Sequence, residues 1–255
     1  MARRSLVLPA DANAAVWRAD ELARAAGVVL ATGHAALDAQ LPGGGWPAGA
    51  MVEILQAQSG QNEWRLLLPA LARSRPGPVV LVGAPHMPFG PGLAAHGLAP
   101  DRLLWVTARA PAARMWACEQ ALRCADVAAV LAWLPQARAD QLRRLQMAAG
   151  EYAKLLFVMR PAQVQSESSP AVLRVLVSVQ SGSDDVRLDV LKRRGPPCMQ
   201  PVLVPARIGR LAALLARSRA GCKAGSGTPL AEVAGPAARP VAESADALDR
   251  VASLA

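Results

Sequence analysis

The chain has 255 residues, of which 53% are hydrophobic and 18% are charged, and its formal net charge is +9. This composition excludes a chain that is disordered throughout, because such chains combine low hydrophobicity with high charge density. It also excludes a membrane-spanning helix, since no stretch reaches the roughly 18 apolar residues that a span needs.

The N-terminus does not have the pattern of a cleavable signal peptide. Pro9, Asp11 and Asn13 interrupt the apolar stretch that such a peptide requires. We therefore expect a cytoplasmic protein with no membrane partner.

The cysteines do not have the spacing of a zinc site. Cys118, Cys124, Cys198 and Cys222 form no Cys-x-x-Cys pair, and only three histidines are present to complete such a site. We expect free thiols in a reducing compartment and no metal site.

Hydrophobic periodicity predicts the secondary structure in chain order. An amphipathic helix is expected over 16–26, within an N-terminal helical segment 1–27, and a turn-rich run follows at 41–49. Short apolar runs then alternate with helical patterns. The predicted strands are 51–55, 79–82, 103–107, 128–134 and 154–159, and the predicted helices are 63–73, 91–96, 112–124 and 140–150.

Strands that alternate with helices favour parallel pairing, with helices covering both faces of the sheet. Two further strands, 172–179 and 186–191, flank the turn-forming run 180–185 and are expected to form an antiparallel hairpin at the sheet edge. A last helix is expected over 205–217. The pattern predicts one α/β core domain over residues 28–217.

The positive charge belongs to this core. Residues 218–255 are rich in Gly, Ala, Pro and Ser and carry four basic and four acidic side chains, so we expect a mostly disordered, neutral tail. The candidate contact residues for DNA phosphate or an acidic partner are Lys192, Arg193, Arg194, Arg207 and Arg210. An ordinary solvated face is the alternative, because no aromatic side chains interleave with these cations to stack on bases.

The segment after the 51–55 strand stands where a phosphate-binding loop would stand. Such a loop reads G-x-x-x-x-G-K-[ST], in which backbone amides and Lys hold the phosphates and the hydroxyl holds Mg²⁺. Here the segment reads Gln56-Ala-Gln-Ser-Gly-Gln-Asn-Glu63. Thr32-Gly33, Gly44-Gly-Trp-Pro-Ala-Gly49 and Val52-Glu-Ile54 precede it. In this order these motifs resemble the RecA family, and the resemblance covers roughly residues 28–204 and implies a RecA-like fold.

The loop departs from that family at the residues that carry the chemistry. Its two glycines fall on Gln56 and Gln61, its Lys on Asn62, and its Mg²⁺-binding hydroxyl on Glu63, and a shift that uses Gly60 restores no Lys. A carboxylate at the hydroxyl position places like charge beside a phosphate. These five positions are therefore degenerate phosphate-loop positions.

Two further groups of a RecA-like ATPase are absent. Gly83-Ala-Pro-His86 stands where the family has a catalytic carboxylate, and Ala132-Trp-Leu-Pro135 stands where a Walker B Asp would be. The resemblance therefore implies no catalytic residues, no nucleotide cofactor and no enzyme activity.

Val16-Trp-Arg18, Gly44-Gly-Trp-Pro47 and Ala129-Val-Leu-Ala-Trp-Leu-Pro135 also resemble the ImuA family of bacterial mutagenesis cassettes. This resemblance implies a role in SOS-induced translesion DNA synthesis. The implied partners are an ImuB-type Y-family-like polymerase homologue, an error-prone replicative-type DNA polymerase and RecA, with DNA as a further candidate.

Three positions match contacts between RecA protomers. Lys192 and Arg194 match two lysines that reach the neighbouring protomer's nucleotide, and Trp17 lies on the helix that in RecA packs on a neighbour. Packing of Trp17 on its own domain is the alternative. Two alternative functions stay open: a SulA-like inhibitor of cell division that binds FtsZ, and an ATP-dependent RecA paralogue.

Overall fold

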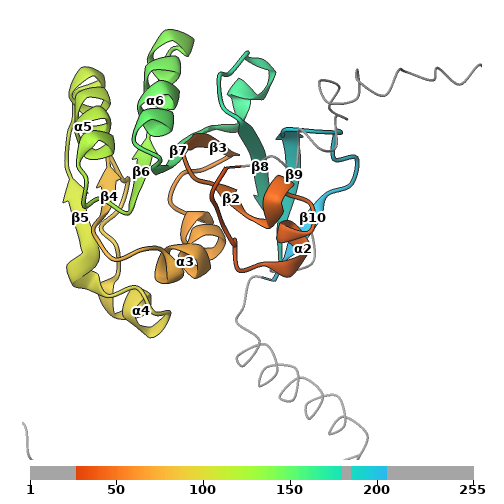
Figure 1. The fold of residues 1–255 in the computed structure, drawn as a ribbon, viewed down its shortest axis with the longest axis horizontal. Coiled ribbons are helices and arrows are strands. Elements are labelled where there is room, and N and C mark those ends of the chain that lie inside the picture. The colour runs from red at the N-terminus through yellow and green to blue at the C-terminus, as the bar shows by residue number, and fades with distance from the viewer. Residues whose placement is uncertain (1–26, 180–184, 206–255) are drawn as a thin grey trace, which may run out of the picture. The chain divides into compact units, whose positions relative to one another are not determined.

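The computed structural model describes residues 27–179 and 185–205 (Figure 1). Four predictions lie wholly or almost wholly outside these residues: the N-terminal helix with Trp17, the turn 180–185, the last helix 205–217 with Arg207 and Arg210, and the tail 218–255. Among the described residues, no helix has the length and apolar character needed to cross a membrane.

A mixed, mostly parallel sheet forms the centre of the described chain. Its eight strands lie in the order β10-β9-β8-β3-β7-β6-β4-β5, and all neighbours from β8 to β5 are parallel. The strands are β3 (Ala50–Gln56), β4 (Val79–Val82), β5 (Leu103–Val106), β6 (Ala129–Trp133), β7 (Leu155–Pro161), β8 (Leu173–Val179), β9 (Val186–Lys192) and β10 (Val202–Val204). The predicted α/β fold is confirmed, and it is consistent with a RecA-like core.

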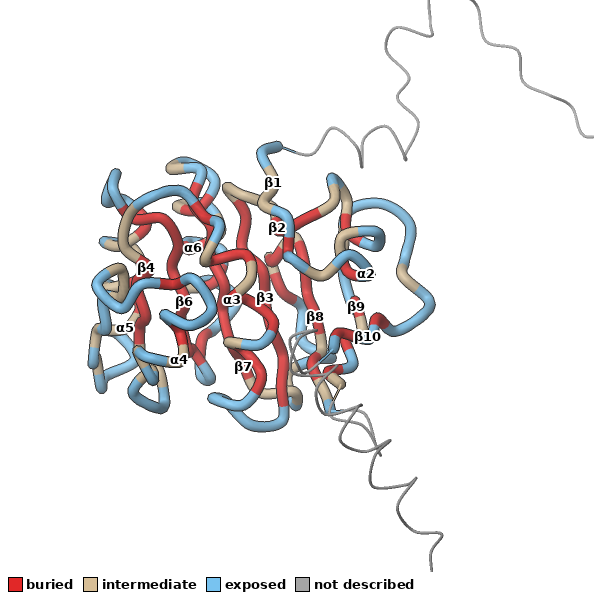
Figure 2. Tube along the Cα trace, turned by 90° about the horizontal axis from the view of Figure 1, so that it is seen from below, coloured by how far each residue is buried: buried red, intermediate tan, exposed pale blue. Residues whose placement is uncertain are grey.

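Helices cover both faces of the sheet (Figure 1). The helices are α2 (Ala35–Asp38), α3 (Glu63–Arg73), α4 (Gly90–Ala95), α5 (Pro111–Arg123) and α6 (Ala139–Glu151), with short 3₁₀ segments η2 (Pro42–Gly44), η3 (Pro100–Arg102) and η4 (Ala162–Ser166). The apolar side chains of α3 and α4 pack on one face, and those of α5 and α6 pack on the other. Every residue of β3, β4 and β6 is therefore buried (Figure 2), as expected for parallel strands between two helical layers.

The sequence pattern misplaced one sheet edge and missed three short strands. β8 and β9 do form the predicted antiparallel hairpin, but β10 pairs with β9 and takes the edge position. The other two missed strands, β1 (Val29–Leu30) and β2 (Trp46–Pro47), form a separate antiparallel ribbon. All three are two or three residues long, too short for an alternating pattern to stand out.

The family-like motifs before β3 have structural roles. The Thr32 amide donates to Asp38 Oδ1 at 2.8 Å and so closes the turn that leads into α2. A Cβ on Gly33, whose φ is +89°, would stand 2.5 Å from Pro69 Cβ, so only glycine lets α3 approach this turn. Trp46 is fully buried and packs edge-to-face on Phe157, with 5.5 Å between the ring centroids.

A buried carboxylate joins the three central strands. Glu53 of β3 is 0% exposed, and its two oxygens lie 2.8 Å from Arg160 Nη1 of β7 and 2.6 Å from Arg174 Nε of β8. Arg174 also donates to the carbonyls of Val164, Gln165 and Glu167, so the network fastens η4 over this face of the sheet. The half-exposed Glu167 carboxylate supplies the second negative charge, 3.0 Å from Arg160 Nη2.

We expect Glu53→Gln to lower the free energy of unfolding by about 3–5 kcal/mol, because it leaves two buried guanidinium groups without their shared counter-ion. Urea denaturation followed by circular dichroism measures this loss. Glu167→Gln is the matched control, since it removes the other carboxylate that contacts Arg160, and its cost should stay below about 1 kcal/mol because Glu167 is exposed. Equal losses in the two variants would contradict a dominant role for Glu53.

His34 makes the stability of the α2 turn depend on pH. Burial lowers the pKa of His34 below its ordinary value of 6.5 and outweighs the backbone hydrogen bonds of Leu66 and Arg65, which raise it; the charges of Asp38 and Arg73 have smaller, opposing effects. Its Nε2 atom is buried and has no hydrogen-bond partner among the described residues. The unfolded chain therefore takes up a proton at a higher pH than the folded chain.

Because the pKa of His34 is lower in the folded chain than in the unfolded chain, we expect the free energy of unfolding to decrease as the pH falls below about 6.5. Denaturation midpoints measured between pH 7.5 and pH 5 should show a smaller decrease in His34→Gln than in the wild-type chain. Identical pH profiles for the two proteins would exclude His34 as the titrating group.

Candidate functional site

The degenerate loop lies at the carboxyl end of a central parallel strand. It connects the last residue of β3, Gln56, to the first residue of α3, Glu63. In open α/β sheets, ligands bind at this edge, where loops meet the N-termini of helices. The structure thus places the five predicted loop positions at the expected end of the sheet.

The Glu63 carboxylate turns back into the loop and is almost fully buried, at 1% exposure. Its Oε1 atom accepts hydrogen bonds from Gly60 N at 2.6 Å, Gln56 Nε2 at 2.5 Å and Trp133 Nε1 at 2.9 Å. Its Oε2 atom accepts one from Asn62 N at 3.1 Å. Four donors from the loop, β3 and β6 therefore converge on one side chain.

These contacts give Glu63 the position of an internal anion. In a phosphate-binding loop, backbone amides and the positive end of the following helix dipole hold the phosphate. Here two loop amides and the first turn of α3 already hold a carboxylate that is part of the chain. From the sequence we expected this carboxylate to repel phosphate; the structure adds that it occupies the donors.

The rest of the loop is closed against the segment after β4. Gly60 has φ +94°, and a Cβ there would fall 2.6 Å from His86 Cδ2, so glycine is needed for both the conformation and the contact. The exposed Gln61 side chain bonds to Gln58 within the loop. Gln61 therefore has a hydrogen-bond partner within the loop, and His86 lies against Gly60.

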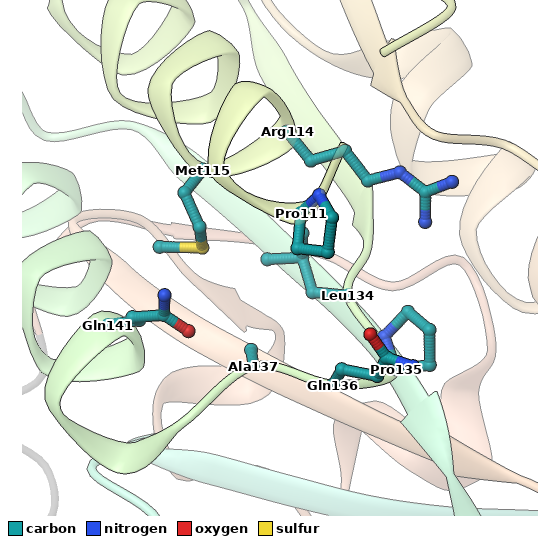
Figure 3. A pocket seen from close by; sticks show the side chains of 8 residues that line it. All are labelled: Pro111, Arg114, Met115, Leu134, Pro135, Gln136, Ala137 and Gln141. Carbon is teal, nitrogen blue, oxygen red and sulfur yellow. The ribbon is translucent and has the colours of Figure 1, made fainter. Parts of the chain in front are cut away.

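The space beside the absent Walker B carboxylate is small. A pocket of about 30 Å³ lies between the start of α5, the segment after β6 and the start of α6 (Figure 3). That volume holds one or two water molecules, whereas pockets for small ligands measure several hundred Å³. Trp133 at the end of β6 is 4% exposed and belongs to the hydrophobic core beside this pocket.

Arg114 is a residue of this edge that the sequence pattern did not single out. Its Nε donates to Ala108 O at 2.8 Å, its Nη1 lies 3.5 Å from Trp133 O, and it packs against Gly83. Its guanidinium has no carboxylate partner among the described residues. Only the strand order shows that the first turn of α5 faces the ends of β4 and β6, so no sequence signal marked it.

The described members of the predicted contact residues lie at the other end of the central strands, where β3 and β8 begin. β9 is antiparallel to β8, and β8 is parallel to β3, so Lys192 at the end of β9 lies near the amino ends of β3 and β8. Seven-residue β3 separates this edge from the loop by about 20 Å. Lys192 Nζ donates to Ser169 O at 2.8 Å, Arg193 Nε donates to Pro196 O at 2.6 Å, and Arg194 is exposed.

The structure therefore divides the predicted site residues into two groups that do not meet. Trp17, Arg207 and Arg210 lie outside the described residues. In the part of the chain that the structure describes, no three His, Cys, Asp or Glu side chains are grouped to hold a metal ion.

We expect Glu63→Gln to destabilise the loop and the start of α3 by about 1–3 kcal/mol, because an amide oxygen replaces a charged acceptor and its NH₂ group faces other donors. Thermal unfolding measures the loss, and tryptophan emission should change because Trp133 loses its charged partner. The exposed Gln61→Ala is the control and should leave both measurements nearly unchanged.

Comparison with models of known protein families gives no match to this chain, and a search of curated proteins gives no match either.

Proposed function

We propose that this chain is a non-hydrolysing RecA-like module that acts as an accessory or scaffold protein in SOS-induced translesion DNA synthesis. The partners we propose are an ImuB-type Y-family-like polymerase homologue, an error-prone replicative-type polymerase and RecA. This proposal combines the resemblance to the ImuA family with the geometry of the loop.

The observation that carries the proposal is the Glu63 carboxylate inside the loop. It accepts hydrogen bonds from the amides of Gly60 and Asn62, and no Lys stands at position 62 to neutralise a nucleotide phosphate. A nucleotide would have to displace this buried anion from four donors and then bind without the usual cation. That balance disfavours the ATP-dependent paralogue and favours a module that works through protein contacts.

The sheet edge at β5 supports a role in protein binding. β5 pairs only with β4 among the described strands, so one side of its backbone is open. Leu104 is 54% exposed and Trp105 is 37% exposed on this strand. Open edges with exposed apolar side chains are common sites for partner strands, and large apolar side chains often anchor interfaces.

Co-purification of the tagged full-length chain from DNA-damaged cells of its source tests the proposal. We expect mass spectrometry to recover the polymerase homologue, and deletion of the gene to lower damage-induced mutagenesis. Recovery of FtsZ, with filamentation on overexpression, would instead favour the SulA-like alternative. Failure to recover any of the three proposed partners, together with unchanged mutagenesis, would refute the proposal.

A double variant, Leu104→Thr with Trp105→Thr, should reduce partner recovery by about tenfold or more, because truncation of interface anchors commonly costs about 2 kcal/mol. Threonine keeps the preference for strand structure. Met147→Ala is the matched control, since Met147 is also a large exposed apolar side chain, at 68% exposure, but lies on α6 and not on β5. Equal recovery with both variants would exclude β5 as the contact edge.

A further inference from the structure

A cavity of about 330 Å³ opens at the amino ends of the parallel strands, at the opposite end from the loop with Glu63. It lies where β3 and β8 begin and where α6 turns into β7, beside the ribbon of β1 and β2. Its volume is in the range of pockets that bind small organic molecules. The small pocket beside Arg114, of about 30 Å³, is not.

The cavity exists because small residues line it. Much of the wall consists of backbone atoms and methyl groups, which leave open the space that larger side chains would fill. The residues of this kind include Gly45, Ala48, Gly49, Ala50, Gly150 and Ala153. Leu41, Pro42, Val172 and Leu173 add apolar surface.

Three backbone carbonyls beside the cavity already accept hydrogen bonds from the chain and do not need a donor from a ligand. The carbonyls at the end of α6 are already bonded, since Lys154 N donates to Ala149 O at 3.1 Å and Ala153 N donates to Gly150 O at 3.4 Å. Gly49 N in turn donates to Lys154 O at 2.9 Å. The interior therefore suits an apolar body.

Among the described residues that line the cavity, the charged ones are Arg193 and Arg194. Arg193 is held by the carbonyls of Pro196 and Gln40, and neither arginine forms an ion pair within the described residues. Two cations beside an apolar interior complement one anionic group attached to an apolar body.

We propose that this cavity binds an organic anion whose aromatic or aliphatic body fills the apolar interior and whose carboxylate, sulfonate or phosphate group meets Arg193 and Arg194. The inference is independent of the translesion role, because it rests on the other end of the sheet. The occupant is a small molecule rather than a nucleotide, since a cavity of about 330 Å³ lies at the lower end of the volumes of ligand pockets and the named residues that line it are mostly apolar.

Titration of the full-length chain with 8-anilinonaphthalene-1-sulfonate, followed by its fluorescence, tests the proposal. We expect saturable binding of one equivalent. The uncharged analogue N-phenyl-1-naphthylamine has the same body without the sulfonate and should bind at least about fivefold more weakly. Absence of saturable binding would overturn the proposal.

Two variants, with one control, separate the contribution of the positive charge to binding from the contribution of the apolar space. Arg194→Gln should weaken binding of the sulfonate about fivefold and leave binding of the uncharged analogue unchanged. Arg143→Gln is the matched control, because it removes the same charge from an exposed position on α6 that does not line the cavity. Val172→Phe should abolish binding of both probes by filling the space.

Binding that is equally weak in Arg194→Gln and Arg143→Gln would overturn the role of Arg194, since net charge alone would explain it. Binding that persists in Val172→Phe would place the probe elsewhere on the surface. Thermal melts of all variants verify that the fold is retained, and Arg194, which is exposed, gives a variant with little risk of unfolding.

Discussion

The described fold depends on the Glu53 carboxylate at the centre of its sheet. Burial of a single charge would cost several kcal/mol, and two guanidinium groups from neighbouring strands offset that cost by direct contact at 2.8 Å and 2.6 Å. Because these contacts need β3 between β7 and β8, the ion network favours one strand order and one register. It also ties η4 to the sheet, so the hairpin β8–β9 and the parallel core form one layer.

Glu63 is a second buried carboxylate, and neutral donors stabilise it instead of cations. Its partners are loop amides and neutral side chains rather than cations. The first turn of α3 and the loop amides, which in related loops hold a ligand, here stabilise the chain's own charge. The Glu63 carboxylate is thus part of the folded structure of the loop, where it accepts hydrogen bonds from four donors.

Open space and unpaired backbone lie elsewhere in the described domain than at these two carboxylates. The carboxyl edge of the sheet carries a closed loop and a pocket of about 30 Å³. The amino edge carries a cavity of about 330 Å³ with two arginines, and β5 leaves an open strand edge with exposed apolar side chains. The cavity and the open strand edge are therefore separate features of the described fold.

The sequence alone determined the α/β class, the parallel core and most element bounds, because buried strands such as 79–82 are short apolar runs and α3 has a clear amphipathic pattern. It also located the loop 56–63 and its missing Lys, since these follow from residue type and order. Tertiary structure alone decided where charged groups meet. Glu53 faces Arg160 and Arg174, which are more than a hundred positions away, and the Glu63 carboxylate turns inward onto Trp133 of another strand. Only strand order shows that Lys192 and Arg194 lie at the edge opposite the loop, because periodicity encodes which face a residue lies on but not which strands are neighbours.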